Sequence, residues 1–126
     1  MTISVEDFHK TYGETVAVEG IRFAVAAGEV LGLAGPNGAG KTTTLRALAG
    51  ILQPTQGRLS IAGFDLATHP VEAKTLLAYV PDDPHLFDRL TVWEHFRFVA
   101  GVYRLMDWRE RAEKLPERLE LVVPGR

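Results

Sequence analysis

The stretch GPNGAGKT, residues 35–42, constrains what this chain can fold into more than any other. It matches the pattern G-x-x-x-x-G-K-[ST] at every fixed position. Glycines at these positions let the backbone adopt positive φ and approach an anion closely, with N–H groups pointing inward. An apolar segment precedes the stretch and a helical pattern follows it, as such a loop requires. The sequence therefore predicts a phosphate-binding loop between a strand and a helix.

The side chains of this loop have expected roles. Lys41 is expected to reach the β- and γ-phosphates of a nucleotide, and Thr42 to offer its hydroxyl to Mg²⁺. The N-terminus of the following helix adds the positive end of its dipole. Thr43 and Thr44 either contact the α-phosphate or serve as ordinary residues of a first helical turn. The predicted nucleotide-binding residues are Gly35, Pro36, Asn37, Gly38, Ala39, Gly40, Lys41, Thr42 and Thr43.

The segments around the loop show alternating and helical patterns of apolar residues. Alternation over residues 3–25, broken by a turn at Gly13, predicts an antiparallel hairpin. The apolar run at residues 30–34 predicts a buried strand that ends at the loop. From Lys41 the spacing becomes helical. The predicted apolar face of that helix is Leu45, Leu48 and either Ile51 or Leu52.

The middle of the chain predicts three further short elements. Residues 58–66 are typical of a strand followed by a turn, and Pro70 is expected to open a short helix. Residues 77–81 predict a strand that Pro81 ends.

The last third of the chain predicts two helices. Thr91 and Glu94 form a capping-box pattern that opens a helix to about Leu105. Asp107 with Glu110 repeats this pattern for a second helix, which Pro116 should kink or end. The predicted apolar face of the first helix is Val92, Phe96, Val99 and either Val102 or Tyr103, and Glu110 with Lys114 is expected to form an i,i+4 pair.

Composition narrows the possible functions. The 126 residues suffice for one domain or part of one, and the formal charge of −2 gives no global field that would gather nucleic acid. The chain contains no cysteine, which excludes disulfides, thiolate zinc sites and a cysteine nucleophile. It has no apolar run of membrane-spanning length, so we expect any membrane role to depend on a partner.

Three segments together resemble the ATP-binding subunits of ABC transporters: GPNGAGKTT, LRALAGILQPTQG and YVPDDPHLFDRLTVWEH. The match is most like the bacterial drug or antibiotic export type. It implies an α/β fold with a P-loop NTPase (RecA-like) core, an N-terminal antiparallel β subdomain and the beginning of a helical subdomain. We expect residues 1–90 to form the β subdomain and core, and residues 91–126 to start the helical subdomain of an incomplete domain.

The resemblance also implies roles for residues outside the loop. Tyr12 stands where the family places an aromatic ring that stacks on adenine, although alone it would be a turn tyrosine. Asp82 stands where the family has Gln or Glu, so it is expected to act with Lys41 in catalysis and with Thr42 on Mg²⁺; Asp83 is a neighbouring candidate. A second interpretation takes LLAYVPDD as a strand ending in metal-binding acids, but Pro81 breaks that strand before the acids.

The implied function is that of an ATPase subunit that uses Mg²⁺ and ATP to energise transport. Implied partners are a transmembrane permease subunit and a second ATP-binding subunit in a head-to-tail dimer, with a cytoplasmic location at the membrane. The family's signature, its strand with the magnesium aspartate and its switch histidine have no match here, so we expect binding with poor turnover. Two alternatives remain: a non-hydrolysing nucleotide-binding module or fragment, and a P-loop kinase of a small metabolite.

Overall fold

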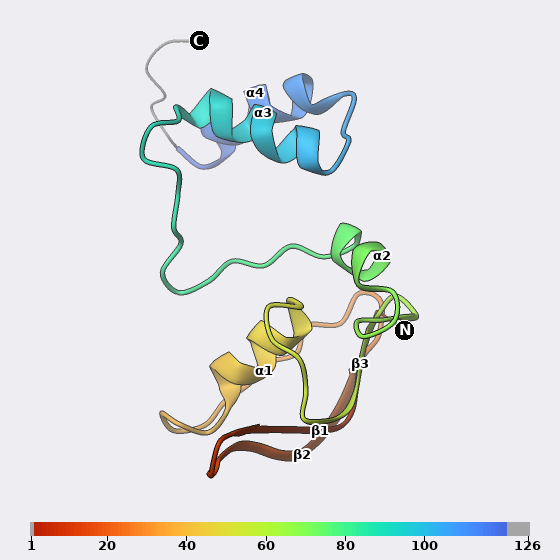
Figure 1. Cartoon of the computed structure of the whole chain (residues 1–126). Coiled ribbons are helices and arrows are strands. Elements are labelled where there is room, and N and C mark those ends of the chain that lie inside the picture. Colours follow the sequence, from red (N-terminus) through yellow and green to blue (C-terminus); the bar gives the residue numbers. More distant parts are fainter. Residues whose placement is uncertain (1, 121–126) are drawn as a thin grey trace. The chain divides into compact units, whose positions relative to one another are not determined.

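The computed structural model describes residues 2–120, which form two compact units (Figure 1). Unit 1 is Met1–Val80 and unit 2 begins at Pro81. Within the described residues, unit 1 contains the four strands and the helices α1 and α2, whereas unit 2 contains α3 and α4. The predicted division into residues 1–90 and 91–126 concerns subdomains and stays a prediction.

Unit 1 is built on a four-stranded antiparallel sheet in the order β2-β1-β3-β4. The predicted hairpin is confirmed: β1 (Ile3–Tyr12) pairs with β2 (Thr15–Val25) from Ile3↔Val25 to Tyr12↔Thr15. The other edge of β1 pairs with β3 (Gln56–Ile61), which turns back into the two-residue β4 (Phe64–Asp65). The first strand is therefore central in this sheet.

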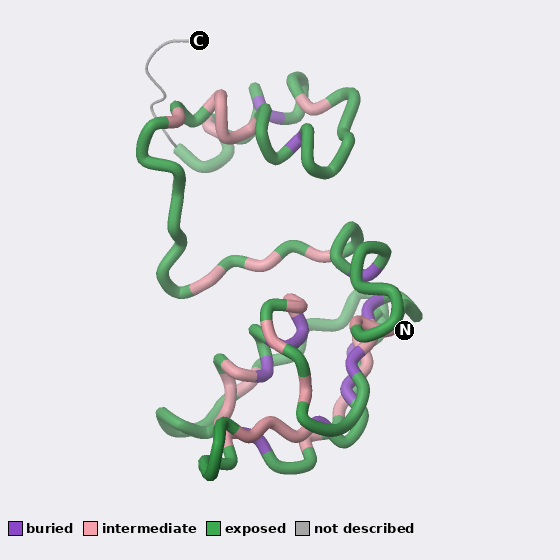
Figure 2. Tube along the Cα trace, in the orientation of Figure 1, coloured by how far each residue is buried: buried purple, intermediate pink, exposed green. Residues whose placement is uncertain are grey.

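The core of unit 1 lies between this sheet and the inner face of α1 (Lys41–Leu48) (Figure 2). The helix buries Thr44, Ala47 and Leu48, whereas Leu45, predicted on the apolar face, is 46% exposed. Thr44 tolerates complete burial because its hydroxyl donates to the Gly40 carbonyl oxygen at 2.8 Å. The core cluster consists of Val5, Phe8, Val18, Ala47, Leu48, Leu59, Ile61 and Ala73.

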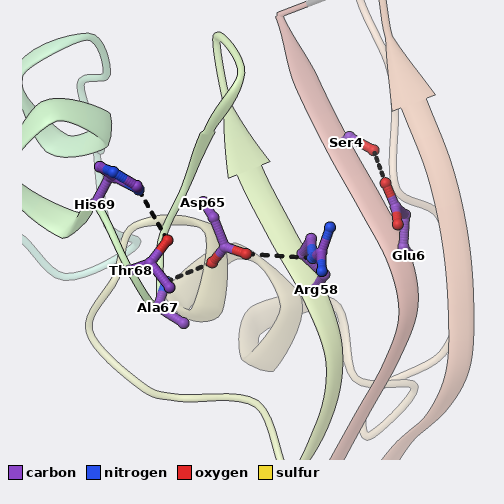
Figure 3. Close-up of polar contacts among 7 residues, drawn as sticks. All are labelled: Ser4, Glu6, Arg58, Asp65, Ala67, Thr68 and His69. Atoms are coloured by element: carbon purple, nitrogen blue, oxygen red, sulfur yellow. Dashed lines mark hydrogen bonds and ion pairs between the residues drawn. The ribbon is translucent and has the colours of Figure 1, made fainter.

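The chain leaves the sheet through a turn fixed by Asp65 (Figure 3). One carboxylate oxygen of Asp65 accepts from the Ala67 N–H at 2.7 Å, and the other pairs with Arg58 at 3.2 Å. A short aspartate side chain commonly bonds the backbone two residues further on, and so shapes a turn. The turn leads into α2 (Pro70–Thr75), the short helix that the proline predicted.

Two predicted strands are absent from the described part of the chain. Residues 30–34 and 77–81 are irregular, and Val30 and Val80 are 99% and 86% exposed. A strand forms only where a neighbour supplies N–H and C=O partners, and within residues 2–120 the sheet ends at β2 and β4. Apolar composition alone was therefore insufficient to make either segment a strand.

Unit 2 contains two helices that pack on each other, α3 (Val92–Val102) and α4 (Trp108–Arg118). Each buries one alanine of its own, Ala100 in α3 and Ala112 in α4. The predicted capping box of α3 is confirmed, and the helix ends three residues before the predicted limit. Within residues 2–120, no helix combines the length and the apolarity needed to cross a membrane.

The ends of α4 differ in part from the prediction. Asp107 occupies the N-cap position, but its side chain makes no capping hydrogen bond, so that prediction is wrong. Its backbone has φ −101° and ψ 33°, outside the extended region that an N-cap residue usually adopts. The helix continues through Pro116 for two residues. The predicted pair of Glu110 and Lys114 is confirmed at 2.7 Å.

Candidate nucleotide-binding site

The loop at residues 35–40 lies against the sheet through Gly40. A Cβ added to Gly40 would stand 2.6 Å from the Ala17 carbonyl oxygen and 2.7 Å from Cγ2 of Val18, both in β2. Gly40 also has φ 83°, and Gly38 has φ 85°, in the left-handed region that glycine adopts without strain. The close contact and the backbone conformation together explain why glycine occupies position 40.

The Lys41 side chain folds back over this loop. Its ammonium donates to the carbonyl oxygens of Gly35 at 2.5 Å and Pro36 at 2.7 Å. The Pro36 oxygen also accepts from the Ala39 N–H at 3.1 Å, which closes a turn within the loop. A positive charge is thus held at the loop itself, where a phosphate would need it.

The N-terminus of α1 presents donors that the helix does not use. The first N–H groups of any helix have no carbonyl partner four residues earlier, which here concerns Lys41, Thr42 and Thr43. The N-cap residue, Gly40, supplies no side-chain cap, and the first turn contains no acidic residue. The first turn of α1 therefore places no carboxylate at the positive end of the helix dipole. The structure brings the predicted residues 35–43 together as one donor-rich loop and helix start.

Tyr12 lies at the end of β1, beside the hairpin turn, and is half exposed. The Lys10 ammonium stands 5.1 Å from the centre of its ring, in a cation–π contact. Figure 1 shows this turn and the loop before α1 at the same end of unit 1, as the contact between Gly40 and Ala17 requires. The adenine-stacking role of Tyr12 stays a prediction.

Asp82 lies in unit 2, apart in the chain from the loop residues of unit 1. Its side chain is exposed, and its neighbour Asp83 pairs weakly with His85 at 3.8 Å. Within residues 2–120, no group of three or more histidine or carboxylate side chains could hold a metal ion. The catalytic and metal-binding roles of Asp82 stay predictions.

His95 makes a contact that we did not predict from the sequence. His95 lies in the first turns of α3, and its ring bonds the backbone of Phe87, eight residues earlier. The other ring nitrogen of His95 contacts the backbone carbonyl of Thr91. Only that second contact had a signal in the sequence, because residues i and i+4 lie next to each other on a helix.

The loop geometry defines a class of protein. A loop that only glycine can close, a lysine held over it and an uncapped helix N-terminus are the parts of a P-loop. In such proteins the backbone of the loop and its lysine hold the phosphates of a nucleotide. The described antiparallel sheet and α1 thus belong to a P-loop NTPase fold, in agreement with the predicted class.

Comparison with known families gives the narrower assignment. The family model described as ABC transporter matches residues 18–123. The chain belongs to the ABC transporter family. This confirms the resemblance that was carried by the loop and by the two segments that follow it.

Individual relatives agree with this assignment. The chain is 38% identical over 118 residues to the probable multidrug ABC transporter ATP-binding protein YbhF of Escherichia coli, covering 94% of this chain and 20% of that protein. It is 40% identical over 101 residues to the SkfA peptide export ATP-binding protein SkfE of Bacillus subtilis, covering 80% and 41%. A solved ATP-binding subunit of an ABC transporter matches with a TM-score of 0.84 at 36% identity, covering 95% and 50%.

The chain spans between a fifth and a half of the length of these relatives. A solved dimeric bacterial ABC transporter cassette is also matched over part of its length, with a TM-score of 0.74 and 26% identity. The match covers 94% of this chain and 56% of that one. Activity, substrates and partners of the whole relatives are therefore matters for proposal.

Proposed function

We propose that this chain binds Mg·ATP through residues 35–43 and belongs to an ATP-binding subunit that energises export across a membrane. The observation that carries the proposal is the loop that Gly40 seats on β2, with the Lys41 ammonium held over it. Such a site suits a polyphosphate, because several N–H donors and one fixed cation converge on a small volume.

The residues present fit the nucleotide. The backbone N–H groups and Lys41 would hold the β- and γ-phosphates, and the exposed Thr42 hydroxyl would bind Mg²⁺. Bound Mg²⁺ would neutralise charge on the phosphate oxygens. Tyr12 would offer one face of its ring to adenine, since Lys10 lies over the ring in a cation–π contact. Asp82 would respond to the nucleotide through Mg²⁺ or its water.

The proposed partners follow from the family. YbhF and SkfE are named for multidrug transport and peptide export, and one solved relative is a dimeric cassette. We propose that the subunit works at the cytoplasmic face of a membrane, with a transmembrane permease and a second ATP-binding subunit in a head-to-tail dimer. Membership of the ABC transporter family argues against the alternative that the chain is a kinase of a small metabolite.

Titration calorimetry with Mg·ATP tests binding. We expect Lys41→Ala to weaken affinity by about tenfold to a hundredfold, because a charged hydrogen-bond donor to phosphate contributes about 1.5–3 kcal/mol. Lys74→Ala is the matched control, since Lys74 lies in α2, outside the loop, and its loss should leave affinity unchanged. Equal affinity of the wild type and Lys41→Ala would refute the proposed site.

A phosphate-release assay tests hydrolysis separately. We expect the 126-residue chain to bind Mg·ATP and turn it over poorly, as a non-hydrolysing module would. Robust turnover that Lys41→Ala abolishes would contradict this expectation, while leaving the binding proposal intact.

A further inference from the structure

The ring of His95 connects α3 to the segment that precedes it. The Phe87 N–H donates to Nε2 of His95 at 3.0 Å, and Nδ1 lies 3.0 Å from the carbonyl oxygen of Thr91. Both ring nitrogens are therefore engaged by backbone groups, one on each side of residues 88–90. We call this pair of contacts the imidazole bridge.

The imidazole bridge requires one protonation state. Nε2 must carry a lone pair to accept from Phe87, and Nδ1 must carry the proton to donate to Thr91. The neutral Nδ1–H form satisfies both contacts at once. If Nε2 also carried a proton, it would be a donor facing the Phe87 N–H, which is itself a donor. That hydrogen bond would then be lost.

Aromatic packing reinforces the same contact. The Phe87 ring stacks on His95 with centroids 5.8 Å apart and meets Phe98 edge-on at 5.2 Å. The Leu90 N–H donates to the Phe87 carbonyl oxygen at 3.0 Å, which closes a turn before the helix. Phe87 is thus held to α3 by its backbone and its ring, although its side chain is 55% exposed.

We propose that His95 is a positioning residue that holds the chain at Phe87 on α3 when its ring is neutral and releases it when the ring is protonated. The importance of this contact for coupling nucleotide binding to a membrane partner rests on the proposed function, because Asp82 lies five residues before Phe87 in the chain. The bridge itself involves only residues of unit 2 and does not depend on nucleotide.

The elements next to the ring carry charges of both signs. Helix α3 carries Glu94 and Arg97, and the preceding turn carries Asp88 and Arg89. Helix α4, which packs on α3, contributes Arg109 and Glu113 to a groove of about 240 Å³ that Glu94 and Arg97 also line. Because charges of both signs lie on each of these elements, we assign the pH response to the bridge itself.

Amide exchange of the full chain labelled with ¹⁵N-phenylalanine tests the proposal. The measured quantity is the protection of the Phe87 N–H relative to an unstructured chain, followed from about pH 8 to about pH 5, the range in which histidine gains its proton. We expect protection in the wild type to fall about tenfold over this range, as expected for one lost hydrogen bond. His95→Gln should show constant protection, because its amide does not titrate.

His85→Gln is the matched control, since it removes an exposed histidine of the same segment. It should keep the pH response of the wild type. The proposal is overturned if Phe87 protection in the wild type does not change with pH, or if it falls equally in His95→Gln. No nucleotide is added, so this result stands apart from the calorimetric test of ATP binding.

Discussion

The starts of α1 and α3 differ in how their free N–H groups are used. Helix α3 begins at a capping box: the Glu94 N–H donates to the Thr91 hydroxyl at 3.3 Å, and the Thr91 N–H donates to the Glu94 carboxylate at 2.8 Å. Helix α1 begins after Gly40, without a side-chain cap and without an acid in its first turn.

This difference separates a structural helix start from one suited to a ligand. A capping box satisfies the orphan donors within the chain and places a negative charge at the positive end of the dipole. The start of α1 forgoes that stabilisation and leaves its donors without a side-chain cap, as the proposed phosphate site requires. Three predictions test this contrast, beginning with the largest expected effect.

Gly40→Ala should damage both the loop and the fold. Its Cβ would clash with the Ala17 carbonyl oxygen at 2.6 Å and would sit on a backbone with φ 83°. We expect a loss of about 2–4 kcal/mol in the free energy of unfolding by urea, and loss of Mg·ATP binding. Gly38→Ala has nothing within 4 Å of the added Cβ and should lose only about 1 kcal/mol. Equal losses in the two variants would contradict the contact with β2.

Thr43→Glu should give α1 the acid that α3 already has. Thr43 is the third residue of α1, the position that Glu94 occupies in α3. We expect Mg·ATP affinity to fall about tenfold or more at low salt, because the carboxylate competes with phosphate, while the free energy of unfolding rises by about 0.3–1 kcal/mol. Thr43→Gln is the neutral control. If the Glu and Gln variants bind Mg·ATP equally, the first turn of α1 is not where phosphate binds.

The capping box should make α3 sensitive to acid. Hydrogen bonds from the Thr91 backbone N–H, and then from its hydroxyl at 2.9 Å, lower the pKa of Glu94. The ionised Glu94 carboxylate therefore stabilises the folded state. This stabilisation is complete above the ordinary carboxyl pKa and is lost as pH falls through the lowered pKa. Helix content, followed by circular dichroism at 222 nm, should fall in that window. In Glu94→Gln this part of the pH dependence should be missing, and an unchanged acid profile would contradict the assignment.

Local chemistry made much of the fold predictable from the sequence. The hairpin, the loop followed by α1 and the capping box each depend on residues close together in the chain. The loop at residues 35–40 is the clearest case, because its glycines stand where the backbone takes a positive φ.

The wrong predictions concern contacts that the local pattern does not contain. The apolar runs at residues 30–34 and 77–81 were read as strands, yet pairing depends on a neighbour elsewhere. Leu45 was placed on the apolar face, but α1 turns Thr44 inward because a threonine hydroxyl can bond within its own helix. The bond between His95 and Phe87 was missed because no motif links the two positions.

The contacts of Lys41 alter the way in which ligand capture at this loop should be understood. Its ammonium already has two oxygen partners, the carbonyls of Gly35 and Pro36, which belong to the loop that would surround a phosphate. An arriving phosphate oxygen would therefore replace a neutral acceptor by a charged one, in an exchange of partners. Selectivity then follows from the difference between the two acceptors, and a ligand without strong negative charge would gain little by displacing the chain's own carbonyl groups.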